Sequence, residues 1–328
     1  MKLSILDQSP VIRGHDARQA IMETLALARR AETLGYHRYW LAEHHAIAAL
    51  ADPCPELLLA RLGAETSRLR VGTGGVLLPY YSAFRTAEAF RMLEALYPGR
   101  IDLGVGRAPG GDARTAQAVA GGGFPDAERF PQQVWELAAH LAGRLPADHP
   151  YKGVRLQPEV ATAPEIWLLG SSDYSGALAA QLGMPFSFAH FINPRGGDKV
   201  TRSYRESFRA VHENQPRTMV CTFAICGEDD ADAERLAQAI DLRRLHMALN
   251  VDAPVPTAEE AARHQYQPEE REYVMGQRSR AVIGGPQRVR RELEAMARRY
   301  GADEVMVLTI TGDYASRMQS YERLVGAF

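Results

Sequence analysis

An apolar run in the sequence ends abruptly in WLAEHH, residues 40–45, on a glutamate followed by two adjacent histidines. Imidazole titrates near neutral pH, so His44 or His45 could transfer a proton, and the pair could also ligate a metal. Neighbouring residues on a strand point to opposite faces, so the two rings could share one ion only if the strand has already ended. The motif HExxH is absent, as are cysteine or acidic clusters at ligand spacing. This pattern favours proton transfer over a metal site and leaves a loop-capping role open.

Two further motifs place glycine or arginine where a strand should end. The segment VGTGG, residues 71–75, permits close approach of a ligand to the backbone, although a tight turn would use the same residues. The segment IDLGVGR, residues 101–107, resembles half of a dinucleotide-binding fingerprint. The next glycine, however, is Gly110, and no acidic ribose ligand follows, so a Rossmann site is disfavoured. Arg107 suits a phosphate or carboxylate, with a surface ion pair as the alternative.

The segment IWLLGSSDYSG, residues 166–176, reads as a strand, a short loop and the start of a helix. Ser172 is a natural N-cap, and Asp173 falls in the first helical turn. A helix N-terminus with free N–H groups and small hydroxyl residues can bind phosphate, although simple capping is the alternative. The motifs GxSxG and GxxxxGK[ST] are absent, so neither a serine-hydrolase elbow nor a P-loop is supported.

These motifs fall at the ends of short apolar runs that alternate with segments of helical period. Strand and helix alternating with short connections indicate a mostly parallel sheet with helices outside. Eight such units favour a (β/α)8 TIM barrel over an open doubly wound sheet, with the catalytic loops following the strands. The predicted strands are 2–6, 38–41, 69–78, 101–105, 166–169, 186–189, 219–225 and 304–310.

Two stretches interrupt this rhythm within what is otherwise a single predicted domain, residues 1–328. Residues 106–125 are rich in glycine, and residues 250–278 are polar and punctuated by proline. Both are long for connections in a compact domain, so we expect active-site loops at the C-terminal face. The best-formed helix follows Pro286, carries an apolar stripe and ends at Gly301.

Composition excludes several classes of protein. The chain has 328 residues, of which 46% are hydrophobic and 24% charged, and its net charge is −2, so nothing points to nucleic acid or a membrane surface. The N-terminus lacks the apolar segment of a signal peptide, and no run is long enough to span a membrane. Cys54, Cys221 and Cys226 are expected to be buried thiols in a reducing compartment. We therefore expect a cytoplasmic protein.

Taken in order, several segments resemble those of the bacterial luciferase-like flavin monooxygenase family, most closely its single-chain oxidoreductases. The resemblance extends over most of the chain, and it depends on the combination and order of the segments. They are LAEHH at 41–45, LRVGTGGVLLPYYSAFRTAEAFRMLEALYPGRIDLGVGRAPGGD at 69–112, GSSDYSGALAAQLGMPFSFAHF at 170–191 and IGGPQRVRRELEAMARRYGADEVMVLT at 283–309.

The resemblance implies a barrel that binds FMN, usually in its reduced form, at the C-terminal face. His44 matches the active-site histidine beside the flavin, a proton-transfer group. Gly74 and Gly75 match a non-proline cis peptide under the isoalloxazine ring, and Arg107 matches an arginine that contacts the phosphate. The residues that match the phosphate loop after the fifth strand are Gly170, Ser171, Ser172 and Ser175.

The sequence also departs from luciferase itself. Gly106 stands where luciferase has a reactive cysteine, and Ser171 stands where it has an acidic residue, so light emission and a long-chain aldehyde substrate are not implied. His190 and Phe191, after the sixth strand, are expected to line the substrate pocket, with a core or loop-packing role as the alternative.

The function that the resemblance implies is an FMN-dependent monooxygenase that uses reduced FMN and O2 to oxidise a small organic substrate. A separate flavin reductase would supply the reduced FMN, and the family habit is a homodimer. Two alternatives stay open: a hydride-transfer enzyme that uses a deazaflavin coenzyme, and a flavin-binding protein without catalysis.

Overall fold

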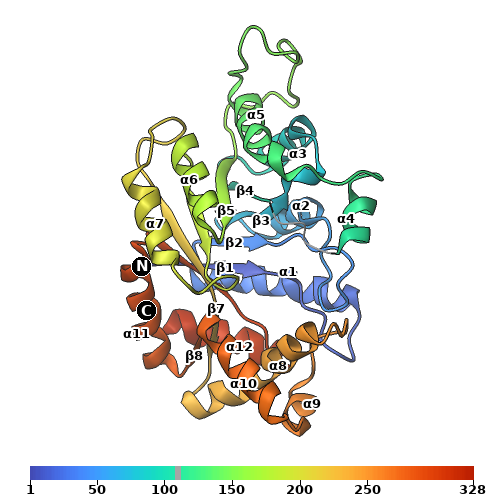
Figure 1. Cartoon of the computed structure of the whole chain (residues 1–328), viewed down its shortest axis with the longest axis vertical. Helices are drawn as coiled ribbons and strands as arrows, with labels where there is room; N and C mark the ends of the chain where they lie inside the picture. The colour runs from blue at the N-terminus through green and yellow to red at the C-terminus, as the bar shows by residue number, and fades with distance from the viewer. Residues whose placement is uncertain (108–111) are drawn as a thin grey trace.

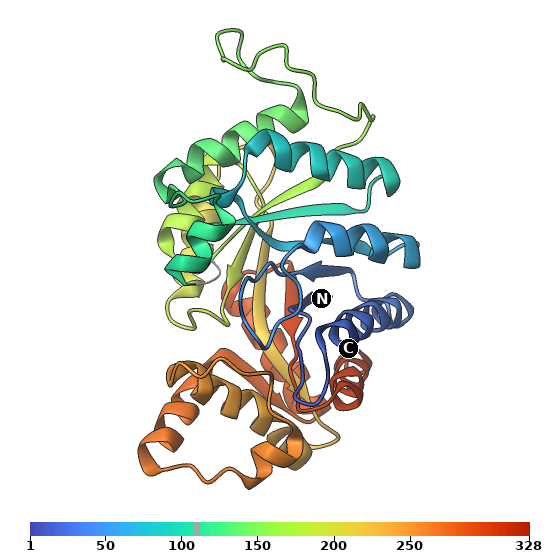
Figure 2. The same ribbon diagram turned by 90° about the vertical axis from the view of Figure 1, so that its right-hand side faces the viewer.

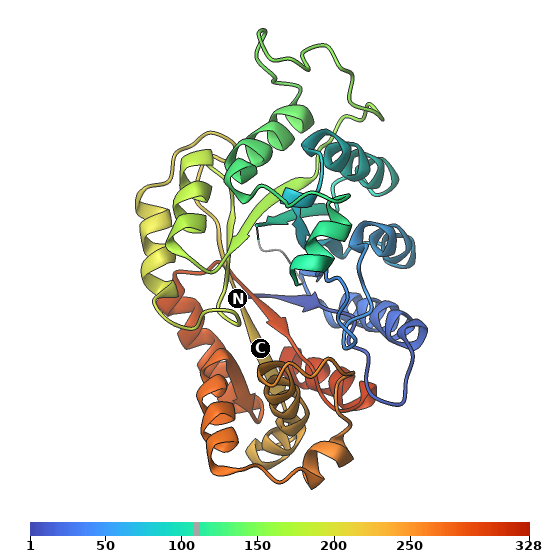
Figure 3. The same cartoon turned by 45° about the vertical axis from the view of Figure 1, so that its right-hand side comes forward.

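The computed structural model describes residues 1–107 and 112–328, and its centre is a closed barrel of eight parallel strands surrounded by helices (Figures 1 and 3). Each strand pairs with the next along the chain, and β9 pairs with both β7 and β1, which closes the barrel. The eight strands are β1 (Lys2–Asp7), β2 (Arg38–Leu41), β3 (Arg70–Leu77), β4 (Ile101–Gly106), β5 (Glu165–Gly170), β6 (Phe186–Ala189), β7 (Thr218–Cys226) and β9 (Glu304–Leu308). The predicted (β/α)8 barrel and its eight strands are therefore confirmed.

A ninth strand lies outside the barrel. β8 (Ala281–Gly284) pairs in parallel with the last four residues of β7, the first of which, Phe223, also pairs with Leu308 of β9. The sequence pattern does not predict β8, because periodicity alone cannot distinguish a strand from a buried helix segment in an apolar run of four residues. β8 extends the sheet past the barrel on the β7 side.

The helices begin and end where local chemistry predicts. Asp16 caps the first helix by accepting a hydrogen bond from the Gln19 N–H at 2.7 Å, and α11 begins at Pro286 and ends at Gly301 in the left-handed conformation. No helix in residues 1–107 and 112–328 has both the length and the apolar character to cross a membrane. The helices are α1 (Ala17–Leu34), α2 (Pro55–Glu65), α3 (Ala83–Leu96), α4 (Ala113–Val119), α5 (Phe130–Ala142), α6 (Asp173–Leu182), α7 (Gly197–Glu206), α8 (Asp230–Ala248), α9 (Ala258–Arg263), α10 (Pro268–Gln277), α11 (Pro286–Tyr300) and α12 (Tyr314–Gly326).

The two stretches expected to be active-site loops differ in form. Residues 250–278 contain α9 and α10, the orange helices at the bottom of Figure 2, rather than an irregular loop. Ala261 of α9 and Val274 of α10 pack in one apolar cluster with α8. The other stretch, 106–125, contains α4, and its residues 108–111 lie outside the described part of the chain.

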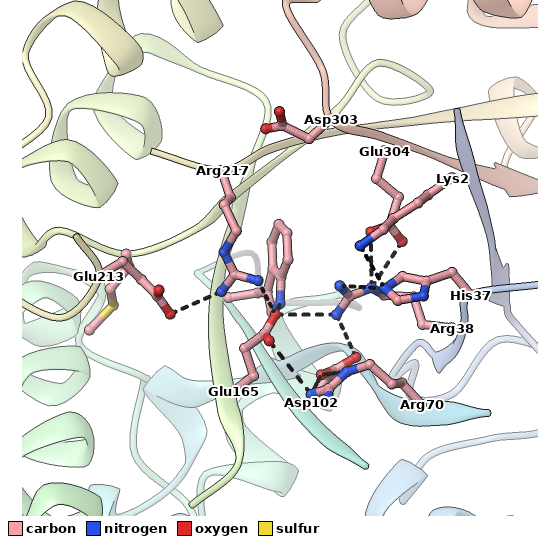
Figure 4. Close-up of polar contacts among 12 residues, drawn as sticks. Lys2, His37, Arg38, Arg70, Asp102, Glu165, Glu213, Arg217, Asp303 and Glu304 are labelled. Atoms are coloured by element: carbon pink, nitrogen blue, oxygen red, sulfur yellow. Dashed lines mark hydrogen bonds and ion pairs between the residues drawn. The ribbon is translucent and has the colours of Figure 1, made fainter. Parts of the chain in front are cut away.

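The N-terminal end of the barrel encloses a network of charged side chains (Figure 4). Arg38 of β2 bonds to Asp102 of β4 at 2.8 Å and to Glu304 of β9 at 2.9 Å, and these three side chains are 3%, 0% and 4% exposed. Arg70 and Glu165 extend the network across β3 and β5. Buried charges are tolerated only when they are paired. Removing one partner would therefore leave the others buried without compensation and would destabilise the fold.

Replacing Arg38 with methionine should destabilise the fold by about 3–5 kcal/mol, because Asp102 and Glu304 would stay buried with one cation fewer. The urea midpoint of unfolding measures this change. Arg61→Met is the control, because the Arg61–Glu65 pair is exposed on the arginine side and should contribute at most about 1 kcal/mol. Equal midpoints for the two variants would contradict the prediction.

Candidate functional site

A cavity of about 280 Å³ opens at the C-terminal ends of the strands, opposite the charged network. A larger groove of about 550 Å³ lies on the outer surface between α2 and α3, and its described lining contains no histidine or cysteine. The chemistry therefore points to the barrel mouth rather than to the larger hollow. The predicted site residues that line the mouth cavity are His44, Gly74, Gly75, Arg107, Gly170, Ser171, Ser172, Ser175 and Phe191.

His44 lies just past the end of β2 and borders the cavity. Its Nδ1 atom is buried and has no hydrogen-bond partner among the described residues. Burial, followed by the positive charge of Arg243, lowers the pKa of His44 to about 4. The ring is therefore neutral near pH 7 and can accept a proton.

Glu43 and His45 hold the loop that presents His44. The buried Glu43 carboxylate accepts hydrogen bonds from the Leu77 N–H at 2.9 Å and the Tyr81 hydroxyl at 2.7 Å, and it lies 2.7 Å from Nε2 of His45. Glu43 thus ties the end of β2 to the end of β3. This arrangement separates the two histidines, because His45 is turned to Glu43 and only His44 borders the cavity.

The glycines of the site lie where a side chain would collide with a neighbour. The Gly74–Gly75 peptide is cis, as expected from the resemblance. A Cβ on Gly74 would lie 2.5 Å from Leu6 Cδ1, and one on Gly75 would lie 2.7 Å from the carbonyl oxygen of Gly104. A Cβ on Gly170 would lie 2.1 Å from Ser175 Oγ. Because Gly74 and Gly75 also line the cavity, its β3 side presents backbone without side chains, which a flat ligand could approach closely.

The other end of the cavity carries hydroxyl groups and a cation. Ser172 is the N-cap residue of α6, but its side chain makes no capping bond and lies 3.2 Å from Ser175 Oγ. The amide of Asn193 donates to the Ser171 carbonyl at 3.1 Å and fixes the loop. The exposed Arg107 guanidinium lies 4.5 Å from the centre of the Tyr174 ring. A helix N-terminus, free hydroxyls and an arginine fit a phosphate.

His190 differs from its neighbour Phe191. Phe191 borders the cavity, whereas the buried His190 ring lies 2.7 Å from the Tyr300 hydroxyl and 3.1 Å from the Ser279 carbonyl. The structure therefore does not bring His190 to the pocket, and its position corresponds to the alternative of loop packing. The cause is the turn after β6, which points residue 190 outward against α11.

Several residues of the cavity are missed by sequence reasoning. Apart from Gln8, which follows β1, they are inward-facing residues of the strands, so only the alternation within each strand could have indicated them. They include the apolar floor and two polar residues: Leu6, Trp40, Leu169, Cys221, Met306, Gln8 and Ser187. Cys221 and Cys226 are buried as expected, but Cys54 is exposed, which corrects that prediction. No metal-binding cluster occurs in the described residues.

Comparison with known proteins identifies the family. The model of the luciferase-like monooxygenase family matches residues 1–304. The chain belongs to this family. A luciferase-like monooxygenase from Escherichia coli (strain K12) is 38% identical over 320 residues, 97% of this chain and 94% of that protein. The N-acetyl-S-alkylcysteine monooxygenase of Bacillus subtilis (strain 168) is 33% identical over 331 residues, 100% of this chain and 98% of that protein. The expected family and enzyme class are thus confirmed.

Solved structures share the barrel. The crystal structure of apo-MsnO8 is 36% identical, covers 100% of this chain and 98% of its own, and superimposes with a TM-score of 0.91. Two structures below 25% identity share the fold alone. One is the oxygenating constituent of 3,6-diketocamphane monooxygenase from Pseudomonas putida in complex with FMN, 20% identical, covering 99% and 96%, with a TM-score of 0.72. The other is an F420-dependent secondary alcohol dehydrogenase, 14% identical, covering 99% and 98%, with a TM-score of 0.67.

The His44 ring of this luciferase-like monooxygenase should titrate near pH 4, which NMR of the imidazole nitrogens can measure with His44→Gln to assign the signal. Because the folded pKa lies below the ordinary value of about 6.5, the unfolded chain binds more protons between these values. Stability should therefore fall as the pH drops from about 6.5 to 4, and it should fall less steeply in His44→Gln. A His44 midpoint above pH 6 would contradict the prediction.

Proposed function

We propose that this protein is an FMN-dependent monooxygenase that uses reduced FMN and O2 to oxidise a small organic substrate. The observation that carries the proposal is one cavity that joins the His44 side chain, the Gly74–Gly75 backbone and the Arg107–serine end. The family of the chain and the FMN complex of a distant structural neighbour support it.

The residues of the cavity fit a flavin. Arg107, the serine hydroxyls and the N-terminus of α6 would hold the phosphate, because charge-assisted hydrogen bonds to phosphate are strong. Gly74 and Gly75 would contact the ring system, because both line the cavity and have no side chain to cover their backbone. When bound, reduced flavin supplies the electrons with which O2 is activated.

The side chains around the flavin have separate roles. His44 is neutral and borders the cavity, and its imidazole would accept or return a proton at the substrate. Leu6, Trp40 and Met306 form an apolar floor that would exclude water from the reacting groups. Glu43 would keep His44 in place by fixing its loop. Catalysis by this chain would thus combine a positioned imidazole with a dry cavity.

The partners follow from the same proposal. A separate flavin reductase would supply reduced FMN. A relative that is 25% identical is named the oxygenase component of a flavin-dependent trigonelline monooxygenase, and this name indicates a separate reductase for that protein. The homodimer expected from the family habit stays a prediction.

Binding of FMN and riboflavin separates the phosphate site from the ring site. Arg107→Met should weaken FMN binding by about 10-fold or more, because one charge-assisted contact to phosphate is lost, and should leave riboflavin binding unchanged. Calorimetry or flavin fluorescence measures both affinities. Arg85→Met is the control, because the Arg85 side chain is 75% exposed on α3, outside the barrel. An equal loss of both ligands in Arg107→Met would contradict the phosphate assignment.

Turnover tests the reaction class. Wild-type protein with FMN, a flavin reductase and ¹⁸O2 should incorporate labelled oxygen into an organic substrate. N-Acetyl-S-alkylcysteines are the first substrates to assay, because a relative 33% identical is named for them. Mass spectrometry detects the label, and His44→Gln should reduce it by about 10-fold or more. Tight F420 binding with hydride transfer, and no FMN binding, would instead support the deazaflavin alternative that the F420-dependent neighbour represents.

A further inference from the structure

Two consecutive arginines near the C-terminal end of α8 are buried. Arg243 and Arg244 are each only 7% exposed, in a run of buried positions from Ala239 to Leu245. This part of α8 is covered on both sides, because one face packs on β7 and β8 and the other packs on α9 and α10. Adjacent residues on a helix point in different directions, so both arginines are buried only because α8 is enclosed.

Among the described residues, the positive charges of these arginines are compensated only by one long ion pair of Arg244. Arg243 forms no ion pair there and its Nε is unpaired, and both Nη atoms of Arg244 are also unpaired. Asp241 is the nearest acid to Arg244, at 3.8 Å, but both its oxygens accept hydrogen bonds from Nε of Arg278 at 2.9 Å. Burial lowers the pKa of each arginine to about 10, which leaves both charged near pH 7. An unpaired buried charge is strongly unfavourable in the absence of a ligand.

Both arginines lie close behind the wall of the cavity that contains His44, and neither lines the cavity itself. The Arg244 guanidinium lies 4.9 Å from the centre of the Phe223 ring, and Phe223 contacts Phe191, which lines the cavity. Among neighbouring charges, that of Arg243 lowers the pKa of His44 the most. The pair is therefore on the β2 and β7 side of the barrel mouth, whereas Arg107 and the serines follow β4 and β5.

We propose that Arg243 and Arg244 bind a carboxylate of the organic substrate, next to His44 and apart from the flavin phosphate. The inference rests on the proposed function, and it assigns the substrate to small organic acids. A carboxylate would neutralise the buried charge, and two guanidinium groups offer enough donors to engage both of its oxygens. The substrate would then be held by its acid end, with its reactive end free to face the flavin.

The test compares hexanoate with hexanamide, a probe of the same length without the charge. Calorimetry with the FMN-loaded protein, and again without FMN, should give at least about 10-fold tighter binding of hexanoate. In Arg243→Met and in Arg244→Met, hexanoate binding should weaken toward that of hexanamide, while FMN affinity should stay within about two-fold. Arg235→Met, an α8 side chain that is 62% exposed, should bind hexanoate as the wild type does.

Stability provides a second readout. Removing an unpaired buried cation should raise the melting temperature of the ligand-free Arg243→Met protein, whereas an arginine with a structural role would lower it. Equal wild-type affinity for hexanoate and hexanamide, or undiminished hexanoate binding in both methionine variants, would overturn the proposal. A parallel loss of FMN affinity would assign the arginines to the flavin and would also overturn it. Wild-type protein that binds hexanoate but not FMN would overturn only the proposed function.

Discussion

The ion pairs of Arg38 with Asp102 and Glu304 are the constraint on which the rest of the barrel depends. They join β2, β4 and β9 at the N-terminal end, where the strands are too close for water to solvate the charges. Asp102 also accepts a hydrogen bond from Trp40 Nε1 at 2.9 Å, so the network orients the indole that forms part of the cavity floor. The Trp40 side chain would in turn lie 3.2 Å from a Cβ on Gly74. The charged network at the N-terminal end thus fixes Trp40, and Trp40 leaves room only for glycine at position 74 in the cavity.

The arginines of the barrel differ in how their charges are compensated. At the N-terminal end, Arg38 is paired with acids from three strands, and at the C-terminal end the buried Arg317 is paired with Asp7 at 2.6 Å. At the C-terminal end, Arg107 and Arg243 have no acidic partner among the described residues. Fully paired charges stabilise a single packing, whereas unpaired ones favour binding of anions. The lack of an acidic partner therefore separates Arg107 and Arg243 from the structural arginines Arg38 and Arg317.

Local patterns were sufficient to predict the frame of the fold. Continuous apolar runs identified all eight barrel strands, and Pro286 and Gly301 defined α11, because these signals act within a few residues. The family resemblance, not the local pattern, distinguished His44 from His45. The Arg38 network could not be predicted, because its partners are 64 and 266 residues away and meet only when the barrel closes. His190 points outward for a similar reason: Tyr300 and Ser279, its partners, come from distant elements.

The insertion of residues 250–278 explains why the arginine pair was also missed. In the sequence, Arg243 and Arg244 look like the solvated face of a surface helix, which is the usual place for such residues. Ala261 and Val274 of the insertion cover α8, and this cover converts two surface cations into buried ones. The strands β3 to β5 and the loops after them line the flavin end of the cavity, whereas α8 and its cover lie behind the opposite wall, where Arg244 contacts Phe223. Under the proposed assignment, a change in the insertion would alter which acids are bound without altering how the flavin is held.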